Sequence, residues 1–166
     1  MKVLDMLYFR VVEGEYMKNI SKVTSWVLVI LWIAFIFYLS HQPATQSNKL
    51  SKQVTQIIVE TVGRIVPDRS LNIRNFNHIV RKNAHFFAYL FLGVLVYNGL
   101  RNSGIKGYRK IVLALVICIV YAITDEVHQL FIPGRGGQIK DVIIDSSGAF
   151  VGIISCKCFS KMSKRS

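Results

Sequence analysis

The chain alternates long apolar stretches with short polar segments. Residues 26–39 and 111–123 contain no charged side chain. A helix needs about 20 mostly apolar residues to cross the hydrocarbon core of a membrane, and each stretch reaches that length when it is extended to its nearest polar boundary. We therefore predict four membrane-spanning helices, at about residues 21–40, 83–100, 110–131 and 142–159.

A further helix is predicted in the long segment between the first two spans. Its apolar residues recur at intervals of three and four, and Pro67 ends the run. They are Leu50, Val54, Ile57, Ile58 and Ile65. This spacing predicts an amphipathic helix on the membrane surface, which either packs over the bundle or covers a site like a lid. The predicted fold is an all-α integral membrane protein, a four-transmembrane-helix bundle with an amphipathic helix in its first extracytoplasmic loop.

Composition leaves no room for a separate soluble domain. The 166 residues are 52% hydrophobic and 18% charged. We predict one membrane domain at residues 21–159, preceded by a cytoplasmic extension (1–20) and followed by a basic cytoplasmic tail (160–166). We expect translation to start naturally at Met17, because the residues that follow it form an ordinary lead into a first span.

The distribution of Lys and Arg predicts the orientation in the membrane. The short connection between the second and third spans carries four basic residues and no acid, and basic residues also precede the first span and follow the fourth. Since cytoplasmic loops carry the excess of Lys and Arg, both termini are expected to be cytoplasmic. The 41–82 segment, with seven basic residues against two acids, departs from this rule. The net charge of +12 is read as contact with anionic lipid headgroups rather than with nucleic acid.

Polar clusters at the ends of three spans are then predicted to meet at the extracytoplasmic face. Lys82, His85 and Tyr89 share one helical face, and Arg81 is one turn from His85. Asp125 lies about 24 Å along its helix from the basic connection, at about 1.5 Å per residue. Carboxylates at such a depth face a bundle interior or a water-filled cavity and find partners. The structural alternative is an ion pair of Asp125 with Arg81 or Arg135 that fixes the helix register.

The connection to the fourth span and the start of that span complete the set. Pro133 ends the third helix, and the glycines around Arg135 leave backbone amides free to face an anion. Asp141 and Asp145 follow one helical turn apart, where they either face the site or stabilise the amino-terminal end of the helix. Gly148 and Gly152 form a Gly-x-x-x-Gly pattern that lets a neighbouring helix approach closely.

These residues form an acid, base and hydrogen-bonding set at one membrane face. The candidate catalytic residues are His85, Asp125 and Glu126. The candidate substrate-binding residues are Arg81, Lys82, Tyr89, His128, Gln129, Arg135, Asp141 and Asp145. No metal ligand is predicted: Asp125, Asp141 and a histidine could hold a divalent ion, but no spacing here is diagnostic of one. The sequence names no cofactor.

The motifs resemble those of the VanZ-like family, in the same order and at the same spacing, from about residue 26 to residue 152. The matching segments are 40–42, 81–89, 125–129, 133–135 and 141–145, with Gly148 and Gly152 after them. The resemblance implies a multi-pass protein of the bacterial cytoplasmic membrane, in a family whose namesake is associated with resistance to teicoplanin, a glycopeptide with a lipid tail. It implies no agreed reaction. Family members often carry Asn at the position of Asp145, which speaks against an obligatory metal ligand there.

Two classes of function follow from these residues. In the first, the protein transfers or hydrolyses a group on an anionic amphiphile or lipid-linked wall precursor: His85 or Glu126 acts as acid or base, Asp125 orients the base, and Arg81 and Arg135 hold the headgroup. In the second, the same site binds a lipid, a lipoglycopeptide or a wall precursor without turnover. The expected partners are therefore membrane lipid and an amphiphilic envelope molecule.

Overall fold

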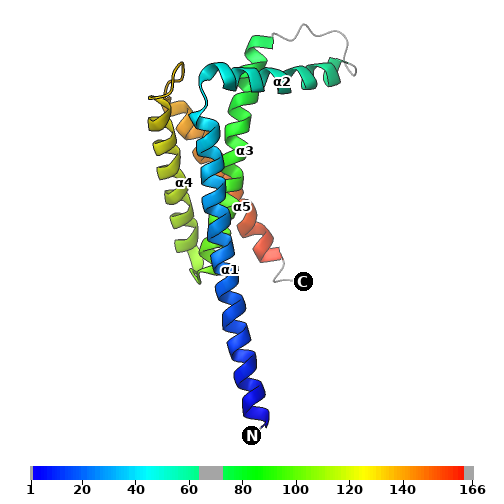
Figure 1. Cartoon of the computed structure of the whole chain (residues 1–166), viewed down its shortest axis with the longest axis vertical. Coiled ribbons are helices and arrows are strands. Elements are labelled where there is room, and N and C mark those ends of the chain that lie inside the picture. The colour runs from blue at the N-terminus through cyan, green and yellow to red at the C-terminus, as the bar shows by residue number, and fades with distance from the viewer. Residues whose placement is uncertain (1, 64–72, 163–166) are drawn as a thin grey trace.

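The structure, a computed structural model, describes residues 2–63 and 73–162. The chain is 88% helical, and the described residues form no strand. The helices are α1 (Lys2–His41), α2 (Ala44–Gly63), α3 (Ile73–Asn102), α4 (Gly107–Gln129) and α5 (Ile139–Met162). Four of them run along the bundle, and α2 lies across one end of it (Figure 1).

The four predicted spans are confirmed. Four helices are long and apolar enough to cross a membrane, over Gly14–His41, Ile79–Asn102, Gly107–Gln129 and Ile139–Ser160. The described helices extend beyond most of the predicted limits, because no proline interrupts α1 before Pro43 and α3 already begins at Ile73. The start at Met17 and the division of the chain into extension, domain and tail remain predictions.

Large apolar side chains on the outside of the bundle are exposed. Ile30 and Leu31 of α1, Val116 and Val120 of α4 and Phe150 of α5 are examples. A bilayer covers such surfaces, whereas a soluble protein rarely exposes so large an apolar area. Together with the four spans, these faces describe a multi-pass membrane protein.

The contact between α3 and α5 is the most extensive in the bundle. A Cβ at Gly148 would overlap the carbonyl of Phe86, and one at Gly152 would overlap that of Leu90. Gly93 of α3 is equally close to the backbone of Ala149. The tight helix packing predicted from the Gly-x-x-x-Gly pattern is thus confirmed, and it fixes the rotation of α5 against α3.

Helix α1 is tied to its neighbours by hydrogen bonds that cross between helices. Trp32 Nε1 donates to the Ala88 carbonyl of α3 at 2.9 Å, and the Tyr121 hydroxyl of α4 donates to the Ile33 carbonyl at 2.8 Å. Indole and phenol groups within a membrane need such partners, because no water is available to them. These bonds hold α1 in register with both α3 and α4.

The predicted amphipathic helix is confirmed as α2, which begins directly after Pro43, earlier than the expected start near Leu50. Ile65 and Pro67, which marked its predicted end, lie outside the described residues. In Figure 1, α2 and the connection between α4 and α5 lie at one end of the bundle, while the amino end of α1 and the carboxyl end of α5 lie toward the other.

Candidate functional site

A polar cavity of about 140 Å³ opens at the end of the bundle that carries α2. Helices α3, α4 and α5 and the 130–138 connection all contribute to it. Its lining residues are Arg81, Lys82, His85, Gln129, Gly134, Arg135, Gly136, Gln138, Asp141, Ile144 and Asp145. The structure therefore brings together residues from all the predicted polar clusters.

His85 and Asp145 face each other across the α3–α5 contact. His85 Nδ1 lies 3.7 Å from Asp145 Oδ2, an ion-pair distance too long for a hydrogen bond. Asp145 is 0% exposed. Their neighbours in sequence explain the meeting: Phe86 follows His85, and Gly148, one turn after Asp145, packs on the Phe86 carbonyl. The glycine contact thereby sets the acid against the imidazole.

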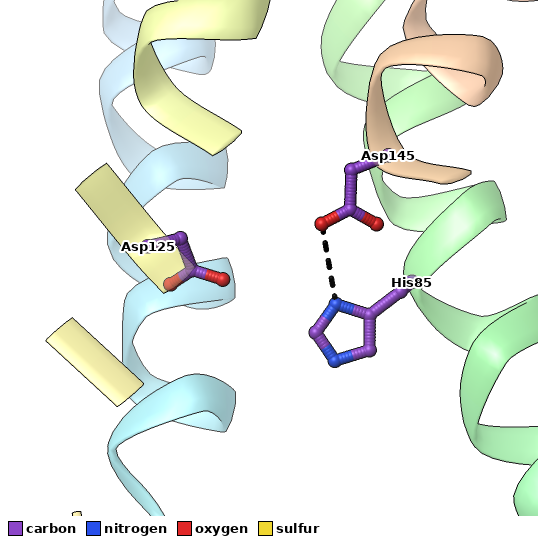
Figure 2. Close-up of side chains that lie close together, drawn as sticks. All are labelled: His85, Asp125 and Asp145. Atoms are coloured by element: carbon purple, nitrogen blue, oxygen red, sulfur yellow. Dashed lines mark ion pairs between the residues drawn. The ribbon is translucent and has the colours of Figure 1, made fainter. Parts of the chain in front are cut away.

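Asp125 is held from the opposite side of the site. The Ser40 hydroxyl donates to its Oδ2 at 2.8 Å, and Gln129 Nε2 donates to the same oxygen at 3.2 Å. The carboxylate is 2% exposed and approaches His85 and Asp145, each of the three offering a possible ligand atom within 4.8 Å of the others (Figure 2). The described residues form no ion pair between Asp125 and Arg81 or Arg135, so that expected pairing is not found.

Ser40 is a site residue that the sequence analysis did not single out. It is 1% exposed and carries the hydrogen bond that orients Asp125. The available signal was its position as the last polar residue of an apolar span, within the 40–42 segment that matches the family motif.

Glu126 turns toward the connection that follows α4. Its Oε2 accepts a hydrogen bond from the backbone N–H of Gln138 at 2.8 Å. The side chain is buried, and Glu126 is not among the residues that line the cavity. In this structure the carboxylate anchors the connection that carries Arg135.

Arg135 reaches back over the site from the 130–138 connection. Its Nη2 donates to the Leu39 carbonyl at 3.0 Å, and the preceding Gly134 has a φ of 74°, a conformation that favours glycine. Burial, and then the positive charge of Arg81, lower the pKa of Arg135. Two guanidinium groups beside one cavity disfavour each other's charge, and a bound anion would relieve this repulsion.

The remaining candidates occupy different places. Lys82 Nζ pairs with Asp141 Oδ1 at 3.3 Å at the rim of the cavity. His128 does not line the cavity but lies against α1, with its Nε2 3.2 Å from His41 Nδ1 and its ring 4.5 Å from that of Phe37. Tyr89 is buried one turn deeper in α3 than His85 and also lies outside the lining.

The model of the VanZ/LLP1 family matches residues 25–160. The chain belongs to this family. The matched region contains every candidate site residue and Ser40. No curated protein and no solved structure matches the chain. VanZ membership carries the expected link to teicoplanin resistance.

This VanZ-family chain also forms an apolar groove of about 430 Å³ beside the polar cavity. Residues of α1, α2 and α3 line it, and about half of the lining residues are aliphatic. They include Ile36, Leu39, Val54, Ile57, Val80, Ala84 and Ala88. The groove and the cavity share Arg81, His85 and Arg135. An apolar space and a polar space therefore adjoin at the same three side chains.

Proposed function

We propose that this VanZ-family protein is an envelope enzyme of the bacterial cytoplasmic membrane that transfers or hydrolyses a group on an anionic amphiphile, either a lipid or a lipid-linked wall precursor. The observation that carries the proposal is the sharing of Arg81, His85 and Arg135 between the polar cavity and the apolar groove. An amphiphile satisfies both spaces at once, with its headgroup in the cavity and its chain in the groove.

The two arginines supply the recognition of charge. A guanidinium group binds a phosphate or carboxylate with two parallel hydrogen bonds and stays protonated at physiological pH. Arg81 and Arg135 come from different elements and line both spaces, so they lie where the headgroup joins the chain. A headgroup bound at this position would account for the presence of two arginines beside a groove whose aliphatic residues fit an acyl or polyprenyl chain.

The proton transfer is assigned to His85. It lines the cavity, and Asp145 stands 3.7 Å from its Nδ1, where a carboxylate orients an imidazole and stabilises its protonated form. His85 takes the proton of the attacking water or acceptor hydroxyl and returns a proton to the leaving group. Glu126, through Gln138, positions the connection that holds Arg135.

The site is proposed to face the outside of the cell, with both termini in the cytoplasm. The basic connection between α3 and α4, which the positive-inside rule assigns to the cytoplasm, lies at the end of the bundle away from α2 (Figure 1). Substrates in the outer leaflet would then reach the groove sideways from the bilayer, beneath α2.

The test compares envelope lipids and lipid-linked wall precursors by mass spectrometry in cells that express wild type, His85→Gln or Glu126→Gln at matched membrane levels. We expect one class of anionic amphiphile to change with wild type and to revert with His85→Gln, since loss of an acid or base costs about 10²- to 10⁴-fold in rate. His41→Gln, a histidine that does not line the cavity, is the matched control and should behave as wild type.

Two outcomes would contradict the enzyme. Pools that do not respond to wild type would exclude turnover of a membrane amphiphile, and photocrosslinking of lipid to the groove in the same cells would then establish the alternative, binding without chemistry. Pools that respond equally to wild type and His85→Gln would remove the assigned role of His85.

A further inference from the structure

His85, Asp125 and Asp145 come from three different helices and converge on one point. Each offers a ligand atom within 4.8 Å of the other two (Figure 2). Protein ligands lie about 2.0–2.2 Å from a bound zinc ion, so two ligands of one ion are separated by at most about 4.4 Å. Three tetrahedral ligands of one ion lie only about 3.3–3.6 Å apart, so the most widely separated of these atoms would approach one another by up to about 1 Å when an ion binds.

The two carboxylates present buried oxygen atoms that lack a donor. Asp145 Oδ1 and Asp125 Oδ1 have no hydrogen-bond partner among the described residues, and these side chains are 0% and 2% exposed. Burying an ionised carboxylate without a partner is costly, and metal coordination is one of the ways in which proteins offset that cost, beside ion pairing and protonation. The orphaned oxygens therefore point to a cation.

Among the described residues, Lys82, Arg81 and Arg135 form no ion pair with Asp125 or Asp145, although Arg135 acts on Asp125 electrostatically. Lys82 pairs with Asp141, and Arg135 donates to the Leu39 carbonyl. His85 is the basic side chain that forms an ion pair with one of these carboxylates, with its Nδ1 3.7 Å from Asp145 Oδ2. One imidazole can neutralise at most one of the two buried carboxylates.

Asp125 is also oriented as a metal ligand would be. Its Oδ2 receives both hydrogen bonds, from Ser40 and Gln129, which leaves the buried Oδ1 without a hydrogen-bond partner among the described residues. Carboxylate ligands are characteristically held by such outer partners, which fix their orientation.

We propose that His85, Asp125 and Asp145 bind one divalent metal ion of the class that accepts mixed nitrogen and oxygen ligands, such as Zn²⁺ or Mn²⁺. Three protein ligands leave a coordination position open toward the cavity that His85 and Asp145 line. In the enzyme proposed above, and resting on that function, this position would accept an oxygen of the anionic headgroup or a water. With the ion bound, His85 would hold the metal instead of transferring the proton itself, and a metal-bound water would supply that proton chemistry. Metal binding itself does not depend on that function.

This metal site differs from the set of possible ligands that was named from the sequence, which was Asp125, Asp141 and a histidine. Asp145, not Asp141, lies beside the histidine, because Asp141 is one turn nearer the rim and pairs with Lys82. An Asn at position 145 would keep one oxygen ligand and lose its charge. We therefore expect the affinity for the metal ion to fall less when a variant keeps the ligand and loses only its charge than when it loses the ligand.

The experiment uses the full chain, purified in detergent through a tag without histidine, treated with a chelator and titrated calorimetrically with Zn²⁺ and, separately, Mn²⁺. We expect one equivalent of at least one ion to bind per chain. His85→Ala and Asp145→Ala should each weaken binding by at least about 100-fold, Ser40→Ala by about 10-fold as an outer partner, and Asp145→Asn by about 10-fold through loss of ligand charge. Helix content and elution volume verify that each variant is folded.

The control is His41→Ala, because His41 and His128 form a second pair of imidazoles at the same end of the bundle. Binding lost with His41→Ala but kept with His85→Ala would overturn the assignment, as would the absence of stoichiometric binding of both ions to wild type. Since no lipid is present, these outcomes are separate from those of the lipid analysis: metal binding with unchanged lipid pools would refute only the enzyme.

Discussion

The two ends of the bundle differ in the charged residues that they carry and in how deeply these residues are buried. At the end with α2, the side chains of Ser40, Asp125, Glu126, Gln129 and Asp145 are buried. At the other end, Arg101, Lys106 and Arg109 are exposed, and the polar contacts there serve to join helices. Charge at the end of a span is ordinary when water can reach it, whereas buried acids cost free energy. Burial of the acids therefore distinguishes the functional end.

The largest expected difference between the two ends is their accessibility from outside the cell. With the three native cysteines replaced, a cysteine at Gly136 in the 130–138 connection should react fully with a membrane-impermeant maleimide added to intact cells. A cysteine at Lys106 should react only after the cells are opened. The reverse pattern would place the polar site in the cytoplasm and contradict the proposed orientation.

The next largest effect should come from the helix contact that sets Asp145 against His85. Gly148→Leu places a side chain where the Phe86 carbonyl stands, and we expect a loss of about 3 kcal/mol or more in the free energy of unfolding, at the upper end for overpacking. Unfolding in detergent, followed by circular dichroism, measures it.

The control for this change is Gly14→Leu, because a Cβ at Gly14 meets no atom within 4 Å. It should leave the unfolding free energy nearly unchanged. Equal effects at the two glycines would show that the α3–α5 contact does not position the site.

The smallest difference concerns two serines of α1 that lie at opposite ends of the bundle, Ser40 and Ser25. Ser40→Ala removes one of the two donors to the buried Asp125 Oδ2, the other being Gln129, and should destabilise the protein by about 1.5–3 kcal/mol, the range for a hydrogen bond to a charged group. Ser25→Ala removes the acceptor for Asn102 Nδ2 in a partly buried contact and an exposed donor to the Ser21 carbonyl; both groups are neutral, so we expect about 1 kcal/mol or less. The same unfolding assay compares them, and a larger loss for Ser25→Ala would remove the distinction between the ends.

Much of the fold follows from patterns within single segments. Uninterrupted apolar stretches predicted the four spans, and three- and four-residue spacing predicted α2. Helix limits were predicted less accurately. Helices α1 and α3 begin many residues before their apolar parts, because polar residues propagate a helix in the absence of proline. Lys and Arg counts indicated an orientation that no contact in the structure tests.

The sequence by itself determined which residues lie at which depth and on which face of their own helix. It placed His85, Asp125 and Asp145 at one level, since 1.5 Å per residue and 3.6 residues per turn are properties of each helix alone. It did not determine how each helix is rotated toward its neighbours.

Only the tertiary structure decided that rotation. Contacts such as Gly148 on Phe86 chose Asp145 over Asp141 as the partner of His85, hydrogen bonding drew Ser40 to Asp125, and His128 turned toward His41 although it shares a helical face with Asp125. The physical reason is that helix packing depends on side-chain shapes from two segments at once. From the sequence, residues far apart along the chain could therefore be assigned to one site. Which of them contact one another within that site could not be predicted.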